Sequence, residues 1–134
     1  MSTKIFVNLP VKDLKKSMEF FTNLGFSFNP QFTDDNAACL VFSEEIYAML
    51  LTEKFFKTFI TKEVTDTSKS VEVINALFLD SRAAVDELVD KALKAGATRY
   101  RDPDEMDFMY SRSFADLDGH LWEIGYMDPG HVQS

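Results

Sequence analysis

The sequence has little cysteine, glycine or histidine: one Cys, five Gly and two His among 134 residues. A single cysteine, Cys39, cannot form a disulfide within the chain, and its apolar neighbours favour an inert core thiol in a reducing compartment. So few glycines argue against a glycine-rich phosphate loop. No apolar run approaches the roughly 20 residues that cross a bilayer, and no signal-peptide pattern opens the sequence. We therefore expect a cytoplasmic protein without membrane contact.

Positive charge is scarce as well. The 14 Lys and Arg residues stand against 22 Asp and Glu, which gives a formal net charge of −8. Such a surface repels nucleic-acid phosphates and anionic lipids, so nucleic acid is not an expected partner. In contrast, hydrophobic residues make up 46% of the chain and include 13 Phe. This length and composition predict one domain, residues 1–134, with a sizeable core.

A pattern of strand, capped helix and further strands occurs twice, about 70 residues apart. Asp13 and then Asp80-Ser81 are typical residues for the start of a helix, and Gly25 and Gly96 for its end. Apolar residues recur at helical spacing between them. Strand-like segments occupy residues 5–11, 26–28, 37–42 and 46–51, and then 71–79, 98–101, 108–114 and 121–126.

Each half therefore predicts the order β-α-β-β-β, an α+β fold with module one at residues 4–52 and module two at 71–128. A ferredoxin-like β-α-β-β-α-β sheet is the alternative, with one strand fewer per half. The linker at residues 53–70 begins with an amphipathic stretch that contains three Phe. It is either a helix packed against the core or a mobile cover over a ligand cavity.

Two motifs near opposite ends of the chain resemble the vicinal-oxygen-chelate superfamily of glyoxalase I, bleomycin-resistance proteins and extradiol dioxygenases. Residues 11–21, VKDLKKSMEFF, resemble its V-x-D-L-x-x-S-x-x-F-Y opening, and residues 113–123, SFADLDGHLWE, its closing F-x-D-P-D-G-x-x-x-E. Leu117 replaces the usual proline. The likeness is strongest to small bacterial glyoxalase-like proteins. It implies two tandem βαβββ modules in a curled mixed sheet around a cavity, usually completed in a homodimer.

In metal-using members of this superfamily a divalent ion binds two substrate oxygens. The resemblance implies ligand positions at Phe6, Leu50, Ile74 and Glu123, and among these only Glu123 has a ligand-type side chain. Sliding a strand by one residue brings up amides or a thioether, which are still poor ligands. We therefore expect no cofactor, and a divalent metal is the less favoured alternative.

Glu123 remains the main candidate for function. Tyr110 or Arg112 on the neighbouring predicted strand could hydrogen-bond its carboxylate, although sequence alone leaves open which face of that strand meets the cavity. Asn8 could contact a ligand from the first strand. The predicted cavity residues are Phe6, Asn8, Leu50, Ile74, Tyr110, Arg112 and Glu123.

Two classes of function follow. The first is a metal-free module of the bleomycin-resistance type, which binds a small molecule in an apolar pocket with Glu123 meeting a cationic or hydroxyl group. The second is an enzyme: a metal-dependent lyase or dioxygenase, or an acid/base isomerase that uses Glu123 as its catalytic residue. The missing ligands favour the first. A dimeric scaffold without a ligand is a third alternative.

Overall fold

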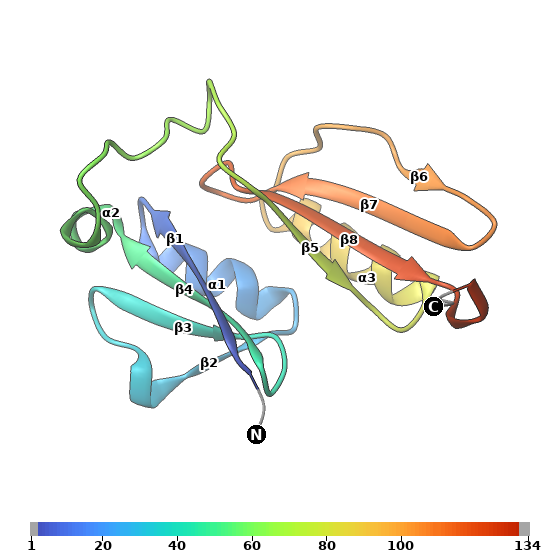
Figure 1. Cartoon of the computed structure of the whole chain (residues 1–134), viewed down its shortest axis with the longest axis horizontal. Coiled ribbons are helices and arrows are strands. Elements are labelled where there is room, and N and C mark those ends of the chain that lie inside the picture. Colours follow the sequence, from blue (N-terminus) through green and yellow to red (C-terminus); the bar gives the residue numbers. More distant parts are fainter. Residues whose placement is uncertain (1–2, 132–134) are drawn as a thin grey trace. The chain divides into compact units, whose positions relative to one another are not determined.

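A computed structural model describes residues 3–131 of the chain (Figure 1). The chain forms two compact units, Met1–Thr65 and Asp66–Ser134. Each unit contains one four-stranded mixed sheet and a main helix in the order β-α-β-β-β. The predicted α+β class with two βαβββ modules is therefore confirmed. The described residues form eight strands, which excludes the ferredoxin-like alternative.

The first unit consists of β1 (Ile5–Val11), α1 (Leu14–Asn23), β2 (Ser27–Asn29), a short 3-10 helix η1 (Pro30–Phe32), β3 (Ala37–Val41) and β4 (Ile46–Thr52). Its sheet has the order β1-β4-β3-β2, with β1 parallel to β4 and the other pairs antiparallel. Asp13 starts α1 as predicted, because its side chain accepts a hydrogen bond from the Lys16 amide at 3.1 Å. Gly25 follows the helix with φ +106°, a conformation that favours glycine.

The core of the first unit lies between α1 and one face of its sheet. Leu9 on β1 pairs with Leu50 on β4, and both are buried together with Phe20 and Phe21 of α1. Burying large apolar side chains of this kind is the main favourable term in folding. Cys39 on β3 is also buried, and desolvation raises the pKa of its thiol. Both findings agree with the expected inert core cysteine.

The second unit consists of β5 (Ile74–Phe78), α3 (Arg82–Lys94), β6 (Asp104–Glu105), β7 (Met109–Ala115), β8 (Leu121–Met127) and a 3-10 helix η3 (Pro129–His131). Its sheet has the order β5-β8-β7-β6, with β5 parallel to β8. Ser81 caps α3 by accepting a hydrogen bond from the Ala84 amide at 3.0 Å. Gly96 ends the helix with φ +113°. The two units therefore share one topology.

The strand predicted at residues 98–101 is wrong. Thr98 forms only an isolated bridge with Ala115, through backbone hydrogen bonds of 2.9 and 2.8 Å, and the chain then leaves the sheet. Pairing with β7 resumes in β6, where Asp104 lies opposite Ser111. Pro103 just before β6 has no N–H to donate to a strand ladder, which is one physical reason for the interruption.

The segment between the two sheets begins with α2 (Glu53–Phe56) and a 3-10 turn η2 (Lys57–Phe59). Thr52 caps α2 through a 3.3 Å hydrogen bond from the Phe55 amide to its hydroxyl. Phe55 is half-buried and meets Phe59 edge to face, whereas Phe59 itself is 66% exposed. The start of the linker is therefore helical, but none of its three Phe side chains is fully buried, contrary to the expected packing against the core. No helix in residues 3–131 is long and apolar enough to span a membrane.

Candidate functional site

The strand register of the second unit decides which side chains share a face with Glu123. Glu123 on β8 lies opposite Ser113 on β7 and Ala76 on β5, and Ser111 lies opposite Gly125. Because side chains alternate along a strand, Ser111, Ser113 and Glu123 point to one face of the sheet. The residues of the other face, among them Phe114, Trp122 and Ile124, are buried beside α3.

This register corrects the expected partners of Glu123. Tyr110 and Arg112 lie on the face that α3 covers, where the Tyr110 hydroxyl donates to Asp86 at 2.5 Å. Arg112 donates to Asp86 and Asp90 of α3, at 3.0 Å each. The hydrogen bond from Tyr110, followed by that from Arg112, lowers the pKa of Asp86. Tyr110 and Arg112 therefore join β7 to the helix instead of contacting Glu123.

The polar partners of Glu123 are Ser111 and Arg101. The Ser111 hydroxyl donates to Glu123 Oε1 at 3.4 Å, and Arg101 Nη2 reaches the same oxygen at 3.5 Å. Arg101 Nη2 also lies 3.5 Å from Asp104 Oδ2. The side chains of Glu123 and Arg101 are 24% and 43% exposed, so the group is accessible from solvent. Two carboxylates and one guanidinium leave this cluster with one net negative charge at neutral pH.

Arg101 reaches Glu123 because of the interruption in the edge strand. The bridge of Thr98 with Ala115 and the pairing of Asp104 with Ser111 bracket residues 99–103. Between these two pairings the segment has five residues, whereas the facing part of β7 has only three, residues 112–114. The extra residues must bulge out of the sheet. Sequence reasoning missed Arg101 because the segment was expected to be a regular strand.

Ser113 stands beside Glu123 on the same face and lies opposite the bulge. The residue is only 5% exposed, and its hydroxyl has no hydrogen-bond partner within the described part of the chain. Buried hydroxyls nearly always have a partner, so this one requires an explanation.

Apolar side chains flank Glu123 on β5. Ile74 and Phe78 lie two residues on either side of Ala76, and 54% and 52% of their surfaces are exposed. The Phe78 ring covers Gly125, where an added Cβ would approach its Cε2 to 2.9 Å. The predicted cavity residue Ile74 therefore shares a face with Glu123, and the same strand brings Phe78, which was not predicted for the site, to that face.

The remaining predicted residues belong to the first unit. Phe6 stacks on Tyr47 with ring centroids 4.6 Å apart, and Asn8 donates to the Phe6 carbonyl at 3.2 Å. Phe6 and Asn8 share one face of the sheet, since their β4 partners are Tyr47 and Met49. Leu50, by contrast, is 1% exposed on the opposite face. The structure thus brings Phe6 and Asn8 together and separates both from Leu50.

The donor set around Glu123 does not fit a divalent metal ion. Its neighbours in the second unit are serine hydroxyls and the Arg101 guanidinium, and a guanidinium repels a cation. Transition metals in proteins are held by several imidazole, thiolate or carboxylate ligands. Across residues 3–131, no group of three or more His, Cys, Asp or Glu side chains is arranged to hold a metal ion.

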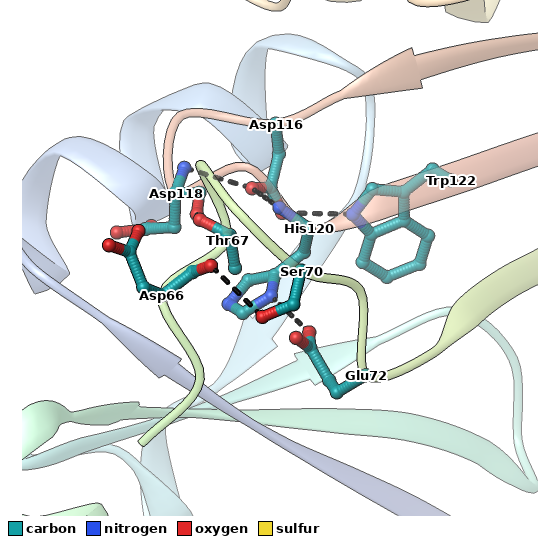
Figure 2. Close-up of polar contacts among 8 residues, drawn as sticks. All are labelled: Asp66, Thr67, Ser70, Glu72, Asp116, Asp118, His120 and Trp122. Carbon is teal, nitrogen blue, oxygen red and sulfur yellow. Dashed lines mark hydrogen bonds and ion pairs between the residues drawn. The ribbon is translucent and has the colours of Figure 1, made fainter. Parts of the chain in front are cut away.

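The turn that leads into β8 contains a second polar cluster (Figure 2). Asp116 is buried and accepts hydrogen bonds from the amides of Asp118 and His120 at 2.9 and 3.0 Å and from the Trp122 indole at 2.9 Å. Burial raises the pKa of Asp116, although the neighbouring His120 and the Trp122 hydrogen bond act in the opposite direction. These contacts fix the start of β8 and therefore the place of Glu123.

The end of the linker is attached to the same turn. Thr67 donates to the Asp118 carbonyl at 2.6 Å, and His120 Nδ1 lies 2.9 Å from Glu72 Oε1 (Figure 2). Gly119 has φ +80°, and a Cβ at this position would meet Thr67 Oγ1 at 2.4 Å. The D-x-D-G sequence of the closing motif thus forms this turn and allows its close contact with the end of the linker.

Comparisons with known proteins agree with this architecture. A family model for the bleomycin resistance protein-like N-terminal region matches residues 3–43. No curated protein matches the sequence. Among solved structures, a hypothetical protein from S. aureus is 29% identical, with a TM-score of 0.78 over 94% of this chain and 95% of that chain.

Two further structures carry family names. A glyoxalase/bleomycin resistance protein/dioxygenase family enzyme from Burkholderia phytofirmans PsJN is 18% identical, with a TM-score of 0.76 over 94% of this chain and 99% of that one. The bleomycin resistance determinant encoded on transposon Tn5 is 17% identical, with a TM-score of 0.65 over 94% and 98%. The chain therefore has the glyoxalase/bleomycin-resistance fold, and its resemblance to the vicinal-oxygen-chelate superfamily is confirmed.

Proposed function

We propose that the protein binds a small molecule through Glu123, on the face of the second sheet that α3 does not cover, without a metal ion. The observation that carries the proposal is the position of this carboxylate: it is partly exposed, beside two serines, and flanked by Ile74 and Phe78. Ligand sites of this kind combine apolar walls with a few placed polar groups.

Electrostatics favour a ligand with a cationic or hydrogen-bond-donating group. The cluster of Glu123, Arg101 and Asp104 has one net negative charge, and the whole chain has a formal charge of −8. Both hydrogen bonds that Glu123 accepts from described side chains reach Oε1. Oε2 is therefore the oxygen available to a donor on the ligand, and a charged donor binds a carboxylate more strongly than a neutral one.

Nuclear magnetic resonance titration of the ¹⁵N-labelled protein with a panel of small amines, alcohols and neutral aromatics tests the proposal. We expect amide shifts to concentrate on β7, β8 and residues 99–103. Replacing Glu123 with Gln should weaken binding of the cationic compounds about 10- to 100-fold, as expected for a lost hydrogen bond to a charged group. Glu19→Gln, on the exposed face of α1, is the matched control and should leave binding unchanged.

Two results would count against this function. One is a titration in which no compound of the panel shifts the amides around Glu123. The other is stoichiometric iron, zinc, nickel or manganese in protein purified without chelator, lost in Glu123→Gln but retained in Glu19→Gln. That second result would instead support the use of Glu123 as a metal ligand.

A further inference from the structure

We propose that the ligand group recognised at this site is a primary ammonium, held jointly by Glu123 and Ser113. The inference rests on the proposed function and specifies the class of ligand. The closing sequence motif gives Ser113 no role, and among residues 3–131 its hydroxyl has no hydrogen-bond partner.

The unpartnered Ser113 hydroxyl points to a missing group. The residue is 5% exposed, so water does not replace the absent protein partner freely. A hydroxyl has one donor and two acceptor positions, and buried hydroxyls are hydrogen-bonded in the great majority of structures. Ser113 therefore offers a desolvated acceptor on the same face as the Glu123 carboxylate.

The register places both acceptors within reach of one small group. Ser113 and Glu123 are directly opposite each other on antiparallel strands, and Cβ atoms in such pairs are about 4.5–5.5 Å apart. An ammonium group has three N–H donors, so it can bond the carboxylate and the hydroxyl together. A quaternary ammonium has no donor, so it cannot hydrogen-bond either residue. An alcohol can donate to Glu123 and accept from Ser113, but it brings no charge to the carboxylate. Among these groups only the primary amine both hydrogen-bonds the two residues and carries a positive charge.

Arg101 can release Glu123 to such a group and keep its other ion-pair partner, Asp104. Its contact with Glu123 is 3.5 Å long, compared with about 2.7–2.9 Å for a strong charge-assisted bond. Asp104 lies at 3.5 Å from the same guanidinium nitrogen and remains as a second acceptor. An incoming ammonium would therefore replace Arg101 at Glu123 and neutralise the net charge of the cluster. Residues 99–103 bulge out opposite Ser113, so movement of this segment would give a ligand beside Glu123 access to the buried Ser113 hydroxyl as well.

Three probes with the same phenylethyl body test the inference on the full chain: 2-phenylethylamine, its N,N,N-trimethyl derivative and 2-phenylethanol. The aromatic body of all three suits the exposed Ile74 and Phe78 side chains. We expect the wild type to bind the primary amine at least about tenfold more tightly than the other two, by titration monitored with amide shifts.

Ser113→Ala is the decisive variant. It should lower the affinity for 2-phenylethylamine about tenfold and leave the affinity for the trimethyl probe unchanged. The variant should fold normally, since alanine removes an unsatisfied hydroxyl without adding volume, and thermal denaturation checks this. Ser43→Ala, in an exposed turn of the first unit, is the control and should bind all probes like the wild type.

The outcomes separate the two proposals. The ammonium inference would be overturned if the wild type bound all three probes equally well. It would also be overturned if Ser113→Ala bound the amine like the wild type. Neither result would contradict ligand binding at Glu123. No shift with any probe and none with the wider panel would overturn both. The joint site is supported if both Glu123→Gln and Ser113→Ala weaken binding of the primary amine. Binding of the trimethyl probe should then be lost only in Glu123→Gln.

Discussion

Asp116 and Glu123 are two carboxylates of the same β-hairpin, yet their surroundings give them different roles. Asp116 is buried and accepts three hydrogen bonds from its own turn and from Trp122. Glu123 is partly exposed and has two long contacts on one oxygen. A carboxylate whose acceptor positions are filled by the protein stabilises the fold, whereas one with a free oxygen can meet a ligand.

Replacing Asp116 with Asn should lower the free energy of unfolding by about 1–3 kcal/mol, because the amide cannot accept from all three buried donors. Urea denaturation at neutral pH measures this change. Asp102→Asn is the control, since that side chain is 97% exposed and should change stability little. Equal stability of the two variants would show that the Asp116 hydrogen bonds contribute no more than surface contacts.

At the scale of elements, the local signals predicted the helices well and the edge strand poorly. The caps at Asp13 and Ser81 and the glycines at 25 and 96 act within a few residues of their own helix, so the sequence reveals them. The interruption after Thr98 depends on pairing with β7, and Pro103 is the one local sign of it. For the same reason, sequence could not decide which face of β7 carries Glu123's partners.

Gly119 tests how the linker is attached to the turn before β8. Gly119→Ala introduces a Cβ 2.4 Å from Thr67 Oγ1 at φ +80°, so it combines backbone strain with a steric clash. Gly25→Ala has φ +106° and meets no atom within 4 Å, so it carries the strain alone. We expect Gly119→Ala to lower the free energy of unfolding by at least about 1 kcal/mol more than Gly25→Ala.

Adding Thr67→Gly to Gly119→Ala should recover part of that difference in urea denaturation, because it removes the atoms that clash. If the two alanine variants are equally stable, the packing of Thr67 on the turn contributes nothing measurable.

The contact between α3 and β7 should depend on pH through Asp86. Hydrogen bonds from Tyr110 and then Arg112 lower the pKa of Asp86 below its ordinary value of 3.8. A lowered pKa in the folded state means that the stabilisation is fully present above pH 3.8 and is lost as the pH falls through the folded-state pKa.

Asp86→Asn should therefore destabilise the protein at neutral pH by about 0.5–1 kcal/mol, a modest amount because the carboxylate is half-exposed. The difference from the wild type should shrink as the pH is lowered below the normal range of Asp. Urea denaturation at several pH values measures it, with Glu87→Gln as the control for a surface ion pair. A difference independent of pH would contradict the ionic origin.

At the scale of the whole molecule, the repeated topology was predictable because each module carries the same sequence pattern. The composition of the site was only partly predictable. Glu123 and Ile74 were expected and share a face of the second sheet. Arg101 is 22 positions from Glu123 and reaches it only through an irregular segment, as the 3.5 Å contact shows. Such long-range pairs depend on the tertiary arrangement, which residue type and spacing do not reveal.

We also propose that the protein forms a homodimer. In both sheets the first strand of the module, β1 or β5, is an edge strand that is paired on one side. Ile5 on β1 and Ile74 on β5 are 53% and 54% exposed. Exposed apolar edge strands favour association with another chain, and lysine on such an edge opposes it.

We expect light scattering during size-exclusion chromatography to give twice the 15.3 kDa mass of the chain. The double variant Ile5→Lys/Ile74→Lys should shift the protein to the monomer, because each lysine places a charge on an apolar edge. Phe32→Lys, at a 62% exposed residue of η1 outside both sheets, is the control and should leave the dimer intact. A monomeric wild type would contradict the proposal, and a double variant that stays dimeric would place the interface away from these edges.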